Sequence, residues 1–175
     1  MTTHQVYIGI GSNIGDRLRY MQEAVRRLDT LQQTTVSAVS SIYMTEPVGE
    51  SSQNRFYNGV LLLNTALPPE ELRRECKIIE QELGRPENYE RWSPRVIDLD
   101  ILLYNLQCFK SETLSIPHRE LHRRKFVLVP LLDLANPLHP EMQRSILQLL
   151  QLCTDRSVLI KTREKIDINK KRSAG

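Results

Sequence analysis

The order of the predicted elements favours an α+β fold: a ferredoxin-like β-α-β-β-α-β core with an antiparallel sheet and C-terminal additions. Two observations support this prediction. Four runs rich in apolar and β-branched residues are typical of strands, at 6–10, 34–43, 56–65 and 96–104. Two stretches between them, 16–31 and 69–83, repeat apolar residues at helical spacing. No internal repeat or linker interrupts this order.

Local chemistry marks where these elements begin and end. The first strand runs into Gly11 and Gly15, which could cradle a phosphate or simply turn the chain into a helix, because the Gly-x-Gly-x-x-Gly and P-loop patterns are absent. Pro69 favours the first turn of the second helix, and Gly84 favours its end. Three later elements are expected: a hairpin arm at 107–115, a buried helix or strand at 126–134 and an amphipathic helix at 145–152.

Length and composition favour a single soluble domain. The chain has 175 residues, of which 40% are hydrophobic and 26% charged, so we expect one domain over 1–160 and a basic, disordered tail over 161–175. The net charge of +3 comes from this tail, which is weak evidence for nucleic-acid binding. We expect a cytoplasmic protein with no membrane partner, since the three cysteines are widely spaced and neither a signal peptide nor a long apolar run is present. A monomer without a nucleic-acid partner is also expected.

The strand at 96–104 carries the most informative chemistry. Because side chains alternate across a strand, Ile97, Leu99, Ile101 and Leu103 are predicted to share one buried face. Val96, Asp98, Asp100, Leu102 and Tyr104 are predicted to share the other. The two carboxylates would then point the same way, with about 7 Å between their Cα atoms.

Two interpretations of this acid pair are open. Asp-x-Asp often lies on the wet face of an antiparallel strand and does nothing more. However, Arg91, Trp92 and Arg95 precede it, which favours a site for a metal-bound polyphosphate beside a planar ring. All-oxygen ligands favour Mg²⁺, as one ion or as a pair.

Other candidates lie outside this strand. Residues 118–125 are strongly basic and predict either a solvated helix face or a phosphate clamp. Asn58, early in a strand, could pair with the edge of a heterocycle or be a satisfied edge residue. Glu80 could be no more than a solvated helix residue.

Together these features resemble the 6-hydroxymethyl-7,8-dihydropterin pyrophosphokinase family over residues 5–155. The resemblance rests above all on the Arg-Trp-Ser-Pro-Arg-Val-Ile-Asp-Leu-Asp-Ile-Leu-Leu-Tyr block at 91–104. Shorter matches precede and follow it in the right order: Gly11-Ser12-Asn13, Tyr43 to Gly49, Asn58, Glu80 with Gly84-Arg85, and Ile116-Pro117-His118 with Arg124 and Phe126.

The resemblance implies transfer of a diphosphoryl group from ATP to the pterin hydroxymethyl group, with release of AMP, in folate biosynthesis. Asp98 and Asp100 would hold two Mg²⁺ ions with ATP, and Arg85 and Arg95 would close over the nucleotide as catalytic residues. Nucleotide contacts are implied for Glu80, Ile101, Ser115, His118 and Arg124. Pterin contacts are implied for Thr45, Val48, Phe56, Asn58, Trp92 and Phe126.

Four positions depart from the family pattern. Ser93 replaces a small residue, Asn88 a frequent Lys, Glu46 a frequent Pro and Phe56 a frequent Tyr. Two alternative functions remain: another Mg²⁺-dependent phosphoryl or nucleotidyl transferase, and an RNA-binding module. The acid pair argues against RNA, because it would repel phosphate unless a metal intervened.

Overall fold

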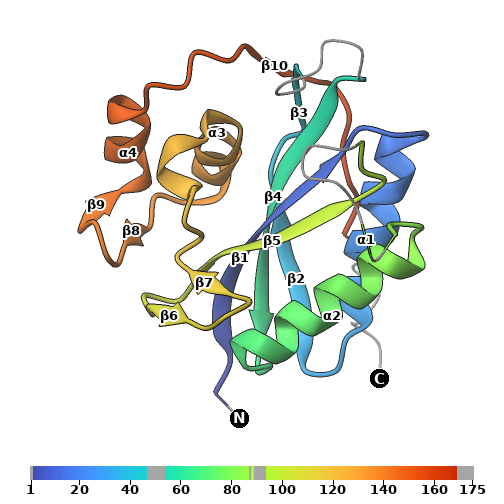
Figure 1. Cartoon of the computed structure of the whole chain (residues 1–175), viewed down its shortest axis with the longest axis horizontal. Coiled ribbons are helices and arrows are strands. Elements are labelled where there is room, and N and C mark those ends of the chain that lie inside the picture. The colour runs from blue at the N-terminus through green and yellow to red at the C-terminus, as the bar shows by residue number, and fades with distance from the viewer. Residues whose placement is uncertain (1, 47–53, 87, 89–93, 169–175) are drawn as a thin grey trace.

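The computed structural model describes residues 2–46, 54–86, 88 and 94–168 (Figure 1). Within these residues, six strands form one antiparallel sheet in the order β10-β3-β4-β1-β5, with β2 also paired to β4. They are β1 (His4–Ser12), β2 (Thr34–Val39), β3 (Tyr43–Thr45), β4 (Phe56–Thr65), β5 (Asp98–Tyr104) and β10 (Leu159–Lys161). The helices are α1 (Arg17–Thr30), α2 (Pro69–Glu82), α3 (Lys125–Leu134) and α4 (Ile146–Leu152), with a 3-10 turn at Leu121–Arg123. Two hairpins complete the structure: β6 (Phe109–Lys110) with β7 (Ser115–Ile116), and β8 (Leu138–His139) with β9 (Arg144–Ser145).

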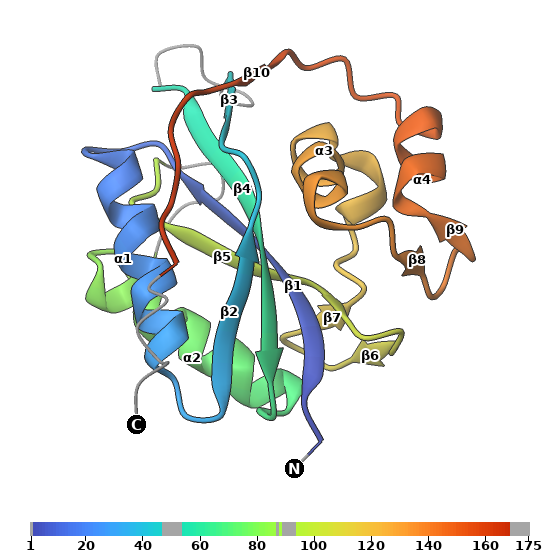
Figure 2. The same ribbon diagram turned by 180° about the vertical axis from the view of Figure 1, so that it is seen from behind.

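The helices cover both faces of the sheet. Helices α1 and α2 lie on one face and α3 and α4 on the other, as Figures 1 and 2 show. Each face has its own apolar cluster: Ile8 and Leu99 belong to the first, whereas Val60 and Leu128 belong to the second. The predicted α+β class and ferredoxin-like order are confirmed.

The predicted second strand, 34–43, is interrupted. Strands β2 and β3 lie along the same edge of β4, and Ser40 sits between them. The Ser40 backbone N–H donates to the Val60 carbonyl at 2.9 Å, and the Ser40 hydroxyl accepts from the Val60 N–H at 2.8 Å. The Ser40 side chain therefore replaces a backbone carbonyl as the acceptor for the Val60 N–H. The strand is interrupted here, yet both backbone groups of Val60 keep a hydrogen bond.

A bulge in β5 changes which side chains share a face. Tyr7 pairs with Leu103, but Ile8 pairs with Ile101, so Leu102 is an extra residue in the ladder. Leu103 consequently packs with α3 and α4, and Tyr104 packs with the α1–α2 cluster. The predicted placement of these two side chains was wrong, because strict alternation fails across a bulge.

The apolar segment 126–134 is helical rather than extended. Helix α3 is apolar over most of its surface, with Val127, Leu128 and Leu131 buried, so its composition carries little periodicity. No helix in the described part of the chain is long and apolar enough to cross a membrane.

Ordered structure continues past residue 160, the predicted limit of the domain. Strand β10 pairs with β3, and the chain then runs along α1 as far as the described residues extend (Figure 2). Ile166 is 8% exposed within the core beside α1, and the Asp167 backbone exchanges two hydrogen bonds with the Gln22 side chain, at 2.7 and 2.8 Å. Two well-spaced isoleucines, Ile166 and Ile168, thus anchor a segment whose overall composition is polar. Residues 169–175 of the predicted tail lie outside the described residues.

Candidate active site

A cavity of about 790 Å³ opens on the α3 side of the sheet, between β1, β3, β4 and β5 below and residues 118–127 above. Nine of the predicted site residues line it: Thr45, Phe56, Asn58, Arg95, Asp98, Asp100, His118, Arg124 and Phe126. They come from four separate parts of the chain, so the fold brings together candidates that the sequence scatters.

Strand β1 forms the floor of the cavity, and its glycines place no side chains there. Gly9 pairs with Asp100, and Gly11 pairs with Asp98 on one side and with Asn58 on the other. A Cβ atom at Gly11 would lie 3.0 Å from the Asn58 Oδ1 atom, which is closer than ordinary packing allows. Gly11 is therefore a strand residue that keeps the floor open, and it lies before the turn into α1.

Two arginines hold the Asp98 carboxylate. Arg85 Nη1 lies 2.6 Å from Oδ1, and Arg95 Nη1 lies 2.7 Å from Oδ2. Burial opposes ionisation of Asp98, but Arg95 and Arg85 outweigh it and lower its pKa. Asn13 orients Arg95, since its backbone and side chain bind the Arg95 carbonyl and N–H at 3.0 and 2.6 Å.

Behind Asp98, the end of α2 protects the edge of the sheet. Glu80 is 1% exposed, and its Oε1 accepts from the Leu99 backbone N–H at 2.7 Å. Arg85 lies 3.0 Å from the same oxygen, and Lys77 Nζ lies 2.9 Å from Oε2. The interpretation of Glu80 as a solvated helix residue was wrong: it replaces the neighbouring strand that β5 lacks.

Asp100 is in a different environment from Asp98. No hydrogen-bond donor among the described residues reaches its carboxylate, which lines the cavity. Burial and repulsion from Asp98 raise its pKa, although His118, Lys77 and Arg124 oppose the shift. A cation in the cavity would relieve both effects.

The basic run forms the wall opposite the acid pair. His118, Arg119 and Arg124 line the cavity, so this part of the run is not a solvated helix face. The His118 Nδ1 atom accepts from the Glu120 N–H at 3.2 Å, which makes Nε2 the protonated nitrogen of the neutral ring. Burial lowers the His118 pKa, and Arg124 adds to this effect against the opposing charge of Asp100.

One end of the cavity is aromatic with a polar edge. Phe56 begins β4 and Phe126 lies in the first turn of α3, and both line the cavity. Nearby, the Asn58 Nδ2 group donates to the Thr45 hydroxyl at 2.8 Å. Flat apolar surfaces beside an amide and a hydroxyl suit a planar heterocycle with polar atoms on its rim.

Residues 7–136 match the family described as 7,8-dihydro-6-hydroxymethylpterin-pyrophosphokinase (HPPK). The chain belongs to this family.

Relatives and solved structures agree with this membership. The 2-amino-4-hydroxy-6-hydroxymethyldihydropteridine pyrophosphokinase of Bacillus subtilis is 44% identical over 135 residues, which cover 77% of this chain and 80% of that protein. The Pseudomonas aeruginosa protein of the same name is 40% identical over 149 residues, covering 85% and 91%. A crystal structure of Plasmodium falciparum HPPK-DHPS with pterin and p-hydroxybenzoate shares the fold, with a TM-score of 0.69 at 15% identity, over 86% of this chain and 43% of that one. This chain therefore spans less than half of that longer protein.

The remaining predicted residues of the HPPK site lie elsewhere. Arg85 and Glu80 sit behind Asp98, outside the cavity lining. The Ile101 side chain is 4% exposed in the α1–α2 cluster, and the Ser115 hydroxyl donates to the Pro117 carbonyl at 3.3 Å. Val48 and Trp92 lie outside the described residues.

Sequence reasoning missed several contributors to this site. Gly9 belongs to the floor, and its two-residue spacing from Gly11, matching that of the acid pair, was a usable signal. Lys77 is one helical turn before Glu80, a spacing that favours an ion pair. Asp155 and Ser157 also line the cavity, and no local pattern pointed to them.

Proposed function

We propose that this HPPK-family chain transfers the terminal diphosphoryl group of ATP to 6-hydroxymethyl-7,8-dihydropterin, a step of folate biosynthesis. One observation carries the proposal beyond family membership: a single cavity joins the acid pair and its cations to an aromatic end with a polar edge. A polyphosphate would bind at the acid pair and its cations, and a pterin would bind at the aromatic end.

Asp98 and Asp100 are the residues that would hold Mg²⁺. The pair fits the ion because both groups are oxygen ligands, because Asp100 has no donor among the described residues and because burial and Asp98 raise its pKa more than His118, Lys77 and Arg124 lower it. No cluster of three or more potential ligands exists in the described residues, so ATP oxygens would complete the coordination. Bound Mg²⁺ would neutralise charge on the phosphate chain. Two ions remain the prediction.

The cations divide into two groups by burial. The Arg85 side chain is 4% exposed and bridges Glu80 and Asp98, so it acts by positioning the acid pair. The Arg95 side chain is 22% exposed and lines the cavity, so it is the arginine that can turn towards a polyphosphate. His118, Arg119 and Arg124 supply donors from the opposite wall.

The pterin and adenine contacts follow from the same geometry. Phe56 and Phe126 stack on the pterin, while Asn58 and Thr45 bind its polar rim. Because the Leu99 N–H points away from β1, alternation turns the Ile101 backbone to the same outer edge. Ile101 would therefore contact adenine through its backbone, since its side chain is buried.

The reaction is a substitution at the β-phosphorus. The pterin hydroxymethyl oxygen forms a bond to this phosphorus, the bond from it to the oxygen shared with the α-phosphate breaks, and AMP leaves with that oxygen. The hydroxyl proton passes to solvent. The protein contributes alignment and charge neutralisation, and no covalent intermediate with a side chain is required.

The test is to quantify AMP from ATP, Mg²⁺ and 6-hydroxymethyl-7,8-dihydropterin, with a control lacking pterin. We expect pterin-dependent AMP and no ADP. ADP instead of AMP would favour the alternative phosphoryl transferase. For the acid pair, Asp98→Asn and Asp100→Asn should lose Mn²⁺ binding, measured by electron paramagnetic resonance with a non-hydrolysable ATP analogue, as well as turnover. Unchanged Mn²⁺ binding would refute the metal assignment.

Monomeric state, cytoplasmic location and the lack of a nucleic-acid partner stay predictions from the sequence.

A further inference from the structure

The C-terminal strap, residues 153–161, forms part of the cavity wall. It leaves α4, passes over the N-terminal end of α3 and joins the sheet as β10, which Figures 1 and 2 show in orange to red. The strap lies outside residues 7–136, where the chain matches the HPPK family. Asp155 and Ser157, which line the cavity, both belong to it.

Three contacts anchor the strap at the aromatic end of the cavity. The Asp155 Oδ2 atom accepts from the Lys125 backbone N–H at 3.0 Å, which caps the start of α3. The Lys125 Nζ group donates to the Ser157 carbonyl at 3.1 Å. Further along, Leu159 pairs with Thr45. Ser157 is therefore held between the first turn of α3, which carries Phe126, and the strand that carries Thr45.

The Ser157 hydroxyl is a buried polar group of this wall whose oxygen receives no hydrogen bond from the described residues. Its Oγ atom is buried and has no partner of hydrogen-bonding geometry in the described part of the chain. Burial opposes ionisation of Asp155, but the Ser157 N–H, the Ser157 hydroxyl and the Lys125 N–H outweigh it and lower the Asp155 pKa, so the hydroxyl lies close to this carboxylate. The described residues offer the Ser157 oxygen no donor, and an unsatisfied buried polar atom is unfavourable, so a donor supplied by a ligand would compensate for it.

We propose that Ser157 is a specificity-determining residue whose Oγ atom accepts a hydrogen bond from a ring N–H of the pterin substrate. The inference rests on the proposed function. The neighbouring Asp155 carboxylate attracts the hydroxyl hydrogen and leaves the oxygen lone pairs for a donor, and dihydropterins carry several N–H groups on their rim. Phe126 and the Thr45–Asn58 pair already define the same end of the cavity as the heterocycle end.

The test compares Ser157→Ala with a matched control, Thr154→Ala, which removes a hydroxyl from an exposed position of the same strap. For each protein we would measure KM for 6-hydroxymethyl-7,8-dihydropterin and for ATP, the Kd for the pterin by fluorescence titration without turnover, and the thermal midpoint. We expect Ser157→Ala to raise the pterin KM and Kd roughly fivefold, the loss of one hydrogen bond. Its ATP KM should stay the same, its midpoint should not fall, and Thr154→Ala should match the parent protein.

Two results would overturn the inference. One is a pterin Kd that Ser157→Ala leaves unchanged. The other is a lower midpoint with KM raised equally for both substrates, which would show that Ser157 only supports the fold. A parent protein that binds pterin but releases no AMP would refute the proposed function, while the comparison of Kd values would still decide the role of Ser157.

Discussion

Removing the Glu80 carboxylate should destabilise the protein more than any single change on the surface of α2. Glu80 accepts the Leu99 N–H at 2.7 Å and lies 3.0 Å from Arg85, and both its side chain and that of Arg85 are almost fully buried. In Glu80→Ala the Leu99 N–H loses its acceptor, which costs about 1–3 kcal/mol. Arg85 keeps Asp98 as a partner at 2.6 Å, so the total should lie near the lower end of the roughly 3–5 kcal/mol typical for breaking a buried ion pair.

The expected loss of about 3 kcal/mol corresponds to a fall in the thermal midpoint of roughly 6–12 °C for a chain of this size. The assay is thermal and urea unfolding followed by circular dichroism. Glu80→Gln keeps an oxygen acceptor for Leu99, and burial already raises the Glu80 pKa and so favours the neutral form. Its loss should be less than half that of Glu80→Ala.

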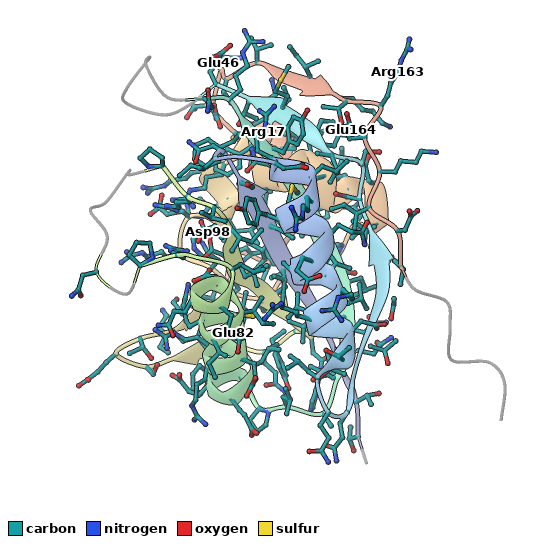
Figure 3. All side chains as sticks on the ribbon, turned by 90° about the vertical axis from the view of Figure 1, so that its right-hand side faces the viewer. Arg17, Glu46, Glu82, Asp98, Arg163 and Glu164 are labelled. Carbon is teal, nitrogen blue, oxygen red and sulfur yellow. The ribbon has the colours of Figure 1, made fainter. Side chains whose placement is uncertain are left out.

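Glu82→Ala is the matched control on the same helix. Glu82, labelled in Figure 3, pairs with Arg27, but its side chain is 55% exposed, so the change should cost no more than about 0.5–1 kcal/mol. Equal midpoints for Glu80→Ala and Glu82→Ala would refute the view that Glu80 stabilises the edge of β5.

Asp100→Asn should abolish turnover, yet it should unfold at a higher urea concentration than the parent protein at pH 7 without Mg²⁺. The folded-state pKa of Asp100 is raised, so the parent protein loses stability as the pH rises through this pKa. The difference in stability between variant and parent should disappear below about pH 4, where the carboxyl is protonated in both the folded and the unfolded state. Gly11→Ala places a Cβ atom 3.0 Å from the Asn58 Oδ1 atom, so the pterin KM should rise by roughly fivefold with the ATP KM unchanged, and equal pterin KM values would contradict the contact. Ile166→Ala should cost about 2–3 kcal/mol in urea unfolding, whereas Ile160→Ala, at a position 46% exposed, should cost far less; equal costs would show that the C-terminal segment is not anchored.

Much of the site was predictable because local patterns specify faces. The two-residue spacing of Asp98 and Asp100 placed both carboxylates on one face of β5, which the structure bears out on the cavity side. The limits of α2 followed from Pro69 and Gly84, since proline suits a first helical turn and Gly84 has a φ of 103° that other residues rarely adopt. These features depend only on a residue and its near neighbours.

Other features depended on contacts between distant segments. The bulge at Leu102 arises from pairing with β1, and it moved Leu103 and Tyr104 to faces that alternation did not predict. Helix α3 could not be told from a strand, because it is buried on most sides and shows little periodicity. The environment of Glu80 was equally invisible, since its main partner is the backbone of Leu99, which is remote in sequence.

The sequence alone therefore determined the element order, the α+β class and the acid pair with its neighbouring cations, because periodicity and turn chemistry are local properties. Tertiary structure decided that the acid pair shares one cavity with Phe56, Phe126 and Asn58, and that the C-terminal strap closes one wall of it. It also decided that Arg85 is buried behind Asp98 while Arg95 faces the cavity. Burial and distance between remote segments set each of these, and no short window of sequence contains that information.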